Sequence, residues 1–573
     1  MASSYTSSSL TLRAILKTAA GRLGMGVPGR QVSGLTPPGK ALFAAVAASR
    51  GPVLLVVPTD ADVELLTADV RFFVSAYEGV SDDEVERSVL PFPSHEVDPY
   101  RGMAPHFDIA SARARALHAL TTGAARVIVA SAASLLPRLA APQRLETAAL
   151  VVSPGLDIAP TDLADLLASA GYTRQDPVDE SGEFCVRGGV VDFYPAGAER
   201  PIRLEFVGDT IESIRAYDPS TQRSTGSVDQ AAIVPLTELP GDPDDADRSA
   251  TFFEYLTLAG RPAVFVSEPD EVKAHGRKTR DQVLASYDDA LARGQRVAQP
   301  DALIVEWEDI EARLDAGTAL ETLALGEEGS VRHIASQPAR EFGGRLQDWV
   351  ADIKQGRERG DTMVFVAHTQ GRAERTIELL ADYSIFAVPM ERAEDAHTAS
   401  VLVGVGRLTR GFRLPDASLQ LWAETDVFEE ERQVHERRKS ATRTFLADFR
   451  DLKVGDLVVH VDHGIGVFVG LKRIDVGLEP QEFMELRYSG EDKLFVPVER
   501  LDLVQRYTGS ARPSLDRLGG TTWEKAKTRV KKAMRDMAEE LLKLYAARKA
   551  VPGHAFSPDS HWQQSSKTRS NGI

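Results

Sequence analysis

Short apolar runs alternate with alanine-rich helical stretches over the N-terminal quarter of the chain. The runs Gly51–Pro58 and Arg126–Ser131 are rich in β-branched residues, and each predicts a strand that is buried on both faces. Between them, Ile109–Thr121 has the composition of a helix. Strands and helices that alternate in this way are typical of a parallel sheet covered by helices.

After Ala149 the pattern changes to short strands of alternating polarity joined by tight turns. The segments Glu183–Phe193, Ile202–Phe206 and Ile211–Arg215 predict a small antiparallel insert. A cluster of proline, glycine and aspartate at Pro240–Asp247 marks its end. Beyond it, apolar runs predict a return to α/β structure, with strands at Pro262–Val266, Ala302–Val305, Thr362–Ala367, Ser384–Val388, Ser400–Gly404 and Ser418–Trp422.

The C-terminal part of the chain has three further patterns. A charged stretch, Glu429–Lys439, predicts a solvated helix. Five short strands then predict a small SH3-like or Tudor-like β-barrel, and they are Leu457–His460, Ile465–Ile474, Glu482–Tyr488, Lys493–Val496 and Leu501–Val504. Trp523–Lys549 has apolar residues at steps of three and four, with nine basic and four acidic residues, which predicts one long basic amphipathic helix.

The fold class predicted from these patterns is multidomain α/β, with a small antiparallel β-containing insert, a second α/β domain, an SH3/Tudor-like β-barrel and a long C-terminal amphipathic helix. An α/β domain interrupted by the insert would occupy residues 1–148 and 241–338, with the insert at 149–240. The additional α/β domain would span 339–450, the barrel 451–520, and the basic helix with a disordered tail 521–573.

Composition and charge exclude several classes of protein. The 573 residues include 67 Lys and Arg against 84 Asp and Glu, a net charge of -17, which disfavours a whole-chain electrostatic clamp on DNA but leaves room for a local basic patch. The single cysteine, Cys185, excludes a disulfide framework and a cysteine-rich zinc site. The sequence has neither a long apolar run nor the pattern of a signal peptide, so we expect a cytoplasmic protein without membrane contact.

One segment, Gly34–Ala41, fits the GxxxxGK pattern of a phosphate-binding loop. Gly34, Gly39 and Lys40 occupy the fixed positions of the pattern, and we expect a helix to follow at Ala41–Arg50. Two prolines inside the loop lack the N–H groups that hold phosphate, and Ala41 offers no oxygen to Mg²⁺. We therefore interpret the segment as a degenerate nucleotide loop and expect no cofactor in this chain.

No other set of side chains predicts catalysis or metal binding. His460 and His463 are three residues apart, and in a strand such positions face opposite sides. No apolar strand that ends in acidic residues, as in an ATPase, follows the degenerate loop in the same α/β block. We expect neither catalytic residues nor metal ligands.

Several motifs, in their order along the chain, resemble a known family. Those similar to the UvrB-homology module are Leu90–Tyr100 (LPFPSHEVDPY), Ser111–Leu117 (SARARAL), Gly182–Pro195 and Arg203–Phe206. Val454–Gly466 and Lys493–Val498 follow them. The series as a whole resembles the N-terminal half of the bacterial transcription-repair coupling factors.

This resemblance implies that the insert binds the repair protein UvrA through Arg187, Arg203 and Val207. Alternation along Ile202–Val207 puts Arg203 and Val207 on the face opposite to the apolar residues, so we expect Arg203 to be exposed. UvrB also has an aromatic hairpin that probes DNA damage. We expect it to be absent here, because no tyrosine-rich stretch separates the first two motifs.

The resemblance also implies that the barrel binds the β subunit of RNA polymerase by lending it a strand edge, and we place the contact at Lys472, Arg473 and Ile474. Alternation predicts a core face with Val467, Val469 and Leu471, and an outer face with Phe468, Gly470, Lys472 and Ile474. The alternative is a bulge at Gly470 that reverses this order and buries Ile474.

For the whole factor, the resemblance implies recognition of RNA polymerase stalled at DNA lesions, its displacement by ATP-dependent DNA translocation, and recruitment of UvrA. The translocase lobes, with their ATP, Mg²⁺ and most contacts to double-stranded DNA, would follow the basic helix, so we expect this chain to be a truncated, non-catalytic scaffold. One alternative is an active nucleotide-hydrolysing helicase fragment that uses Lys40. Another is a regulator of the CarD type, a family that lacks an α/β half of this size.

Overall fold

The computed structural model describes residues 11–100, 105–239, 246–323, 331–390, 400–428, 455–460, 463–476, 479–489, 492–497, 504–506 and 515. Two of the expected helices, Glu429–Lys439 and Trp523–Lys549, lie outside these residues, as does most of the expected strand Leu501–Val504. The chain divides into two units, Met1–Glu431 and Arg432–Ile573.

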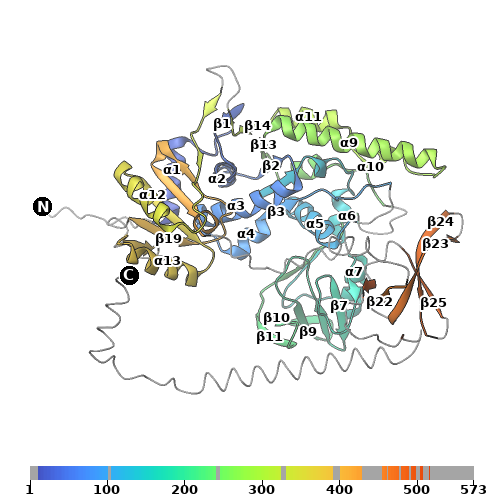
Figure 1. Ribbon diagram of the computed structural model, residues 1–573. Helices are drawn as coiled ribbons and strands as arrows, with labels where there is room; N and C mark the ends of the chain where they lie inside the picture. Colours follow the sequence, from blue (N-terminus) through green and yellow to red (C-terminus); the bar gives the residue numbers. More distant parts are fainter. Residues whose placement is uncertain are drawn as a thin grey trace, which may run out of the picture. The chain divides into compact units, whose positions relative to one another are not determined.

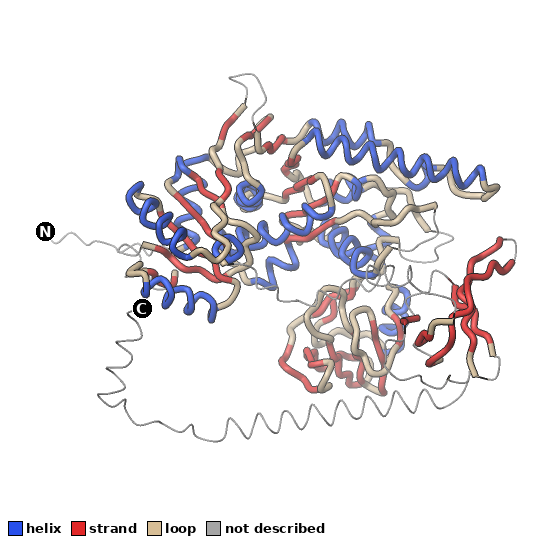
Figure 2. The backbone as a smooth tube through the Cα atoms, viewed as in Figure 1, coloured by secondary structure: helices blue, strands red, loops and turns tan. Residues whose placement is uncertain are grey.

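The first unit contains a parallel seven-stranded sheet in the order β15-β1-β14-β13-β2-β4-β3 (Figures 1 and 2). Its strands are β1 (Gln31–Ser33), β2 (Val53–Val57), β3 (Val89–Phe92), β4 (Val127–Ser131), β13 (Ala263–Ser267), β14 (Thr318–Glu321) and β15 (Arg332–His333). Alternate residues of β2 enter two different cores, Val53 and Leu55 on one face, Leu54 and Val56 on the other. This confirms the doubly buried strands that the apolar runs predicted.

Helices cover both faces of this sheet. On one face α1 (Leu12–Leu23), α2 (Pro37–Ala48) and α3 (Asp60–Glu78) share its core. On the other face lie α5 (Phe107–Thr121), α6 (Pro142–Thr147), α8 (Phe252–Leu258), α9 (Pro269–Ala292) and α11 (Trp307–Asp315). The remaining helices between these strands are α4 (Asp82–Ser88), α10 (Pro300–Leu303) and the 3-10 turn η1 (Ala133–Leu135).

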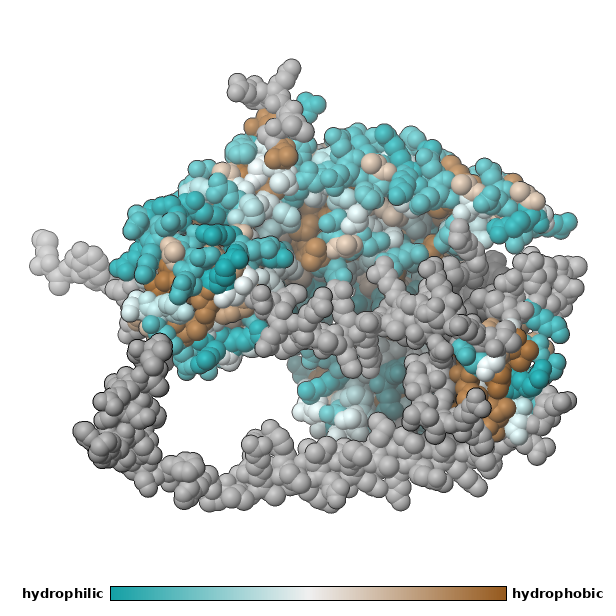
Figure 3. Space-filling view, in the orientation of Figure 1, coloured by the Kyte–Doolittle hydropathy of each residue, from teal (hydrophilic) through white to brown (hydrophobic). Residues whose placement is uncertain are grey.

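Ion pairs join α9 to α11 along their length. The Nζ of Lys273 lies 2.8 Å from Asp315, and Arg277 and Arg280 contact Glu311 and Glu308 at 2.8 and 2.9 Å. The surface over these helices is largely hydrophilic (Figure 3). Lys273, Arg277 and Arg280 of α9 are therefore engaged within the domain.

One strand expected in this domain is wrong. Ala302–Val305 was expected to be a strand, but α10 begins at Pro300, a residue that favours the first position of a helix. An apolar run of four residues fits a helical turn as well as a strand. The strand that the sheet uses, β14, starts at Thr318 and was not anticipated.

The insert is a six-stranded sheet in the order β11-β10-β9-β8-β7-β6, antiparallel except for the parallel pair β6 and β7. Its strands are β6 (Thr173–Arg174), β7 (Glu183–Arg187), β8 (Val190–Phe193), β9 (Ile202–Val207), β10 (Thr210–Asp218) and β11 (Arg223–Ser227). Helix α7 (Pro160–Ser169) contributes Leu163 and Leu167 to the core on one face. A separate two-stranded ladder joins β5 (Leu150–Val152) to β12 (Ala231–Ile233).

A buried ion pair fixes the end of the insert to the α/β domain. Glu238 lies against Arg113 of α5, with a 2.5 Å contact between carboxylate and guanidinium, and 2.7 Å from His95. Arg113 also donates to the carbonyl oxygens of Pro93 and Ser134. Burial alone would raise the pKa of Glu238, but Arg113 and His95 lower it to about 2. The insert is thus anchored by a carboxylate that stays ionised.

A third sheet of the first unit has the order β16-β20-β21-β17-β19-β18, with parallel pairing from β21 to β18. Its strands are β16 (Gln337–Pro338), β17 (Thr362–Ala367), β18 (Ala387–Pro389), β19 (Val401–Val405), β20 (Phe412–Leu414) and β21 (Leu419–Ala423). Its helices are α12 (Leu346–Arg359), α13 (Gln370–Asp382), α14 (Glu424–Val427) and the 3-10 turn η3 (Pro415–Ala417). Val364, Val366 and Phe412 join the core under α1 to α3, so this block packs directly on the first α/β domain.

The second unit is an antiparallel five-stranded sheet in the order β25-β24-β23-β22-β26. Its strands are β22 (Leu457–His460), β23 (Gly464–Val476), β24 (Glu479–Arg487), β25 (Lys493–Pro497) and β26 (Val504–Arg506). Within the described residues no pairing joins β25 to β26, so the described strands form an open sheet and not the closed barrel that we expected.

No described helix of the chain combines the length and apolarity needed to cross a membrane.

The order of faces along β23 also differs from the expectation. Phe468, expected on the outer face, is buried beside Met484 and Leu486, whereas Val467 and Val469 are half-buried. The register with β24 shifts between Phe468 and Gly470. An extra residue at this point inverts the alternation between buried and exposed side chains along β23. A strict period of two therefore assigns the residues before the bulge to the wrong faces.

Candidate functional site

A row of polar side chains crosses the insert sheet on the face away from its apolar core. Cys185 of β7 is opposite Asp192 of β8, Asp192 is opposite Arg203 of β9, and Arg203 is opposite Arg215 of β10. Residues directly opposite one another in a sheet project to the same side. The sheet register therefore gathers side chains from the four consecutive strands β7 to β10.

Arg203 is fixed within this row by two neighbours. Its Nε and Nη2 donate to the two carboxylate oxygens of Asp192, at 2.7 and 2.8 Å. Its guanidinium lies over the ring of Tyr217, 4.7 Å from the centroid. The paired hydrogen bonds to Asp192 raise the pKa of Arg203, which stays charged.

The environment of Arg203 corrects one expectation. Its side chain is only 19% exposed, because Asp192 and Tyr217 enclose it, although alternation placed it on the solvent face as expected. Sequence reasoning missed both of these neighbours. The signal for Asp192 was present in the polar residue between the apolar ones of Val190–Phe193, which aligns with Arg203 once the hairpin is paired.

Arg187 and Val207 flank the row and are more open. Arg187 forms a hydrogen-bonded ion pair with Asp176 that lowers the pKa of the Asp176 carboxyl, and its Nη1 lies 3.9 Å from Asp192. The Arg187 side chain is 43% exposed, and Val207 at the end of β9 is 64% exposed. The three residues that we expected to meet UvrA thus share one sheet and differ in exposure.

Cys185, at the end of this row opposite Asp192, is a buried thiol. Burial raises its pKa, so the thiol stays protonated at neutral pH. Cys185 therefore lacks the low pKa of a reactive cysteine. Its side chain projects to the same face of the sheet as Asp192.

The degenerate nucleotide loop is folded differently from a phosphate-binding loop. Helix α2 begins at Pro37, earlier than the expected Ala41, with Thr36 as its N-cap and prolines at its first two positions. The N–H of Gly39 is directed at the hydroxyl of Thr36. Prolines are favourable at these positions because the N–H groups of the first helical turn have no carbonyl partner within the helix, so their loss removes no hydrogen bond. The prolines that argued against phosphate binding thus have a structural role.

Lys40 of this loop is buried and paired inside the protein. Its Nζ donates to Glu268 at 2.6 Å and to Ser267 at 3.0 Å. The same Glu268 oxygen accepts hydrogen bonds from the backbone and the hydroxyl of Thr322, at 2.9 and 2.7 Å. A carboxylate of the chain therefore occupies the position opposite the lysine where a phosphate would be expected.

A segment that follows β15 covers the same loop. The N–H of Ile334 donates to Ser33, the N–H of Ser336 donates to Gly34, both at 2.9 Å, and the hydroxyl of Ser336 lies 2.6 Å from that of Thr36. Gly34 has a positive φ, and a Cβ there would lie 2.6 Å from the carbonyl oxygen of Ile334. The close approach requires glycine at this position and leaves the loop backbone in contact with protein.

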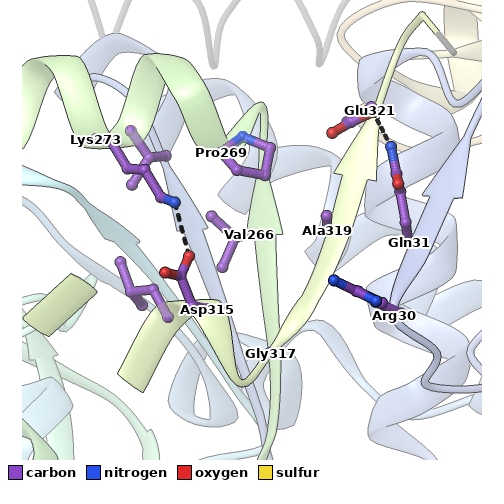
Figure 4. A pocket seen from close by; sticks show the side chains of 11 residues that line it. Arg30, Gln31, Val266, Pro269, Lys273, Asp315, Gly317, Ala319 and Glu321 are labelled. Atoms are coloured by element: carbon purple, nitrogen blue, oxygen red, sulfur yellow. Dashed lines mark hydrogen bonds and ion pairs between the residues drawn. The ribbon is translucent and has the colours of Figure 1, made fainter. Parts of the chain in front are cut away.

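A cavity of about 400 Å³ lies on the sheet near α9, between β13, β14 and β1 (Figure 4). Lys273 pairs with Asp315 at one wall, and Gln31 donates to Glu321 at the other, at 2.5 Å. It contains none of the site residues expected from the sequence. Its acidic groups are already paired, so it offers no free pair of carboxylates for acid–base chemistry.

The expected polymerase contact is described only in part. Lys472 is exposed, with Nζ 5.6 Å from the ring centre of Phe495, while Arg473 and Ile474 are opposite Glu482 and Gln481 and their side chains lie outside the described part. Strand β22 pairs with Gly464–Val467 only. Among the described strands, none pairs with the other edge of β23 from Gly470 onwards.

The two histidines of the second unit are closer than their spacing suggested. The rings of His460 and His463 lie 4.7 Å apart, because β22 ends at His460 and β23, which pairs with it in antiparallel orientation, begins at Gly464. Positions three apart face opposite sides only within one strand. Within the described residues, no group of three or more His, Cys, Asp or Glu is placed to hold a metal ion.

Three family models match successive parts of the chain. Residues 150–239 match the UvrB interaction domain, residues 358–427 match the MFD D3 domain, and residues 452–508 match the CarD-like/TRCF RID domain. The first match coincides with the sheet that bears Arg187 and Arg203, and the third with the five-stranded sheet.

Curated proteins named transcription-repair-coupling factor are similar over most of the chain. The one from Myxococcus xanthus is 30% identical over 588 residues, which is 90% of this chain and 49% of the relative. Those from Bacillus subtilis and Escherichia coli are 25% and 28% identical, over 94% and 90% of the chain and 50% and 48% of the relatives. The chain thus spans about half the length of the curated relatives that it matches.

Proposed function

Because the chain belongs to the transcription-repair-coupling factor family, we propose that it is the scaffold part of such a factor, which links UvrA to RNA polymerase. In the whole factor, this part would recognise polymerase stalled at a DNA lesion and recruit UvrA. Displacement of the polymerase by ATP-dependent translocation, with ATP, Mg²⁺ and most contacts to double-stranded DNA, would belong to regions outside this chain. The protein would act in the cytoplasm.

The observation that carries this proposal is the arginine-bearing face of the insert. Arg187 and Arg203 are charged, lie on one face with the exposed Val207, and occupy the region that matches the UvrB interaction domain. Arginine forks and apolar side chains together favour a protein surface that supplies carboxylates around an apolar contact. UvrA is the partner that the resemblance names for this face.

The second partner, the β subunit of RNA polymerase, would add a strand to β23. The half of β23 from Gly470 to Val476 pairs with β24 on one side only, within the described residues. A free strand edge offers backbone N–H and C=O groups to an incoming strand. Lys472, Arg473 and Ile474 lie along this half, and the complete sheet would curl as a small barrel with the edge open.

The α/β domain would act as a structural base without nucleotide chemistry. Lys40 is neutralised by Glu268, and Ser336 with its neighbours covers the loop. The alternative is the nucleotide-hydrolysing helicase fragment. For Lys40 to reach a phosphate, the pair with Glu268 would have to separate and the covering segment would have to leave.

A binding experiment tests the scaffold proposal directly. The whole chain is immobilised and exposed to purified UvrA, to purified RNA polymerase, and to both together. The proposal expects each partner to bind alone and a ternary complex when both are present. A titration with ATP and Mg²⁺ on the same chain separates the alternative, because only the helicase reading expects saturable nucleotide binding.

A further inference from the structure

We propose that Asp192 is a positioning residue of the insert: it holds Arg203, and through a longer contact Arg187, in the orientation in which they meet the partner protein. The inference rests on the proposed function, because it assigns the arginine face to UvrA binding. It adds a residue to that site which would not touch UvrA itself. The side chain of Asp192 is 1% exposed, whereas those of Arg203 and Arg187 are 19% and 43% exposed.

The buried charge of Asp192 is compensated by the two arginines. Its oxygens accept from Arg203 at 2.7 and 2.8 Å, and one of them lies 3.9 Å from Arg187. An ionised carboxylate taken out of water is costly unless it is paired and hydrogen-bonded. Asp192 therefore restrains Arg203 strongly, because any rotation of the guanidinium away from it would leave the carboxylate unpaired.

The geometry leaves one part of each guanidinium for a partner. Arg203 uses Nε and Nη2 on Asp192, while its Nη1 makes no hydrogen bond within the described residues. Arg187 uses Nε and Nη2 on Asp176, and its Nη1 is beyond hydrogen-bond distance of Asp192. A guanidinium has five N–H donors, so each arginine can keep its internal bonds and still donate to a carboxylate.

Tyr217 completes the restraint on Arg203. Its ring, fully buried, lies 4.7 Å from the guanidinium and blocks rotation of the plane on that side. With Asp192 at one edge and Tyr217 against one face, the arginine has little freedom left to lose when a partner binds. Groups held in this way by a supporting layer bind more tightly than the same groups on mobile side chains.

Two substitutions separate positioning from charge compensation. Asp192→Asn keeps the shape but offers one acceptor where the carboxylate offers two, so one of the paired bonds to Arg203 is lost. Asp192→Glu keeps the buried charge but moves the carboxylate by the length of one methylene. Glu212→Gln, at an exposed carboxylate of β10 in the same sheet, is the matched control.

The experiment measures UvrA affinity, polymerase affinity and thermal unfolding of the whole chain for each variant. We expect Asp192→Asn and Asp192→Glu each to weaken UvrA at least tenfold, with polymerase binding unchanged and unfolding still cooperative. Glu212→Gln should bind both partners like the wild type. Phenylglyoxal modifies arginine side chains, and its reaction with Arg203 in the absence of UvrA can be followed by mass spectrometry. This reaction should be faster in both Asp192 variants than in the wild type.

The outcomes distinguish this inference from the proposed function. If Arg203→Glu abolishes UvrA binding but both Asp192 variants bind like the wild type, Asp192 is not a positioning residue and the proposed site stands. If Asp192→Asn does not fold, Asp192→Glu decides, and wild-type affinity in that variant overturns the inference. If Arg203→Glu leaves UvrA binding unchanged, the proposed site and the inference both fail.

Discussion

Lys40 and Glu268 form an ion pair in which Nζ and Oε1 are 2.6 Å apart and the lysine is only 3% exposed. Glu268 adopts a left-handed backbone conformation directly before Pro269, the first residue of α9. Non-glycine residues hold such a conformation only where the surroundings enforce it. The carboxylate is therefore placed against Lys40 by the strand β13, the start of α9 and Thr322 together.

The first prediction is that the chain has no ATPase activity of its own. Phosphoryl transfer needs the lysine and the Mg²⁺ ligand as electrostatic stabilisation, and here the lysine is paired and Ala41 has no oxygen. Phosphate release should stay at the buffer rate with and without DNA. DNA-stimulated release that Lys40→Ala abolishes would contradict this reading.

A second prediction follows from the structural role of the same lysine. Lys40→Met should lower the free energy of unfolding by roughly 1–3 kcal/mol without any nucleotide present, because Glu268 loses a charged partner but keeps Thr322. Lys354→Met, at an exposed lysine of α12, is the control and should change stability by less than about 0.5 kcal/mol. Denaturant melts of the three proteins measure the difference. Equal stability would mean that the buried pair is dispensable.

The third prediction concerns the arginine face. Arg187→Glu combined with Arg203→Glu should abolish UvrA binding and leave polymerase binding intact, since truncation of a buried interface arginine alone costs roughly 2 kcal/mol or more. The charge-matched control is Arg200→Glu combined with Arg223→Glu, two exposed arginines of the same domain. Pull-downs with each purified partner provide the measurement. A double reversal that still captures UvrA normally shows that the residues were mapped wrongly.

The fourth prediction is a pH dependence at the contact between the first α/β domain and the third sheet. Asp69 of α3 is buried and accepts hydrogen bonds from the backbone and hydroxyl of Thr409, both at 2.8 Å. Burial raises the pKa of Asp69 to about 7, from an ordinary value of 3.8. Between these two values the folded state binds more protons than the unfolded state, so stability should fall as pH rises from about 4 to 7 and then level off.

Asp69→Asn tests this dependence. The amide imitates the protonated carboxyl, so the variant should lose that part of the pH dependence and be more stable than the wild type by roughly 2–4 kcal/mol above pH 7. Asp98→Asn, a half-buried aspartate elsewhere in the same unit, is the control. Thermal melts at pH 5 and pH 8 on the three proteins measure it. Parallel pH profiles for wild type and Asp69→Asn would rule the mechanism out.

The strands of the α/β sheets could be predicted because burial on both faces leaves a continuous apolar run, as in β2 and β4. Ala302–Val305 could not be assigned, because four apolar residues fit either regular structure. The bulge between Phe468 and Gly470 was considered only as an alternative to the regular alternation, and its effect on the faces of β23 could not be predicted, for a different reason. It depends on how β23 pairs with β24, which the period of one strand does not contain.

For the candidate site, too, some residues could be predicted from local sequence motifs, whereas others depend on long-range contacts. Arg187 and Arg203 were identifiable from motifs in the sequence, but Asp192 acquires its role only through the register of β8 with β9. Likewise the prolines of the nucleotide loop were visible, whereas Glu268 and Ser336 come from segments more than 200 residues away. Contacts of this kind depend on the tertiary fold and have no local signal.

The last prediction places the polymerase contact on the free edge of β23. The register sets Lys472 opposite Phe483 and Ile474 opposite Gln481, while Leu471 is opposite the core residue Met484. Ile474 is thus two positions from the exposed Lys472 and on the opposite face from Leu471. An apolar residue next to a charged one at an open edge suits the rim of an interface better than the core.

Ile474→Arg should therefore leave the melting curve unchanged, abolish capture of RNA polymerase and keep UvrA binding. Val405→Arg, at a valine of the third sheet that is 48% exposed, makes the same chemical change away from the edge and should bind both partners. Met484→Arg, in the core of the same sheet, shows what unfolding of this unit looks like in the melt. If Ile474→Arg melts like Met484→Arg, the isoleucine is a core residue and the alternative with a buried Ile474 holds. An arginine at an apolar strand-pairing edge would introduce a charge that the incoming strand has to desolvate. If the Ile474→Arg variant is folded and still captures polymerase, the contact therefore lies elsewhere on the sheet.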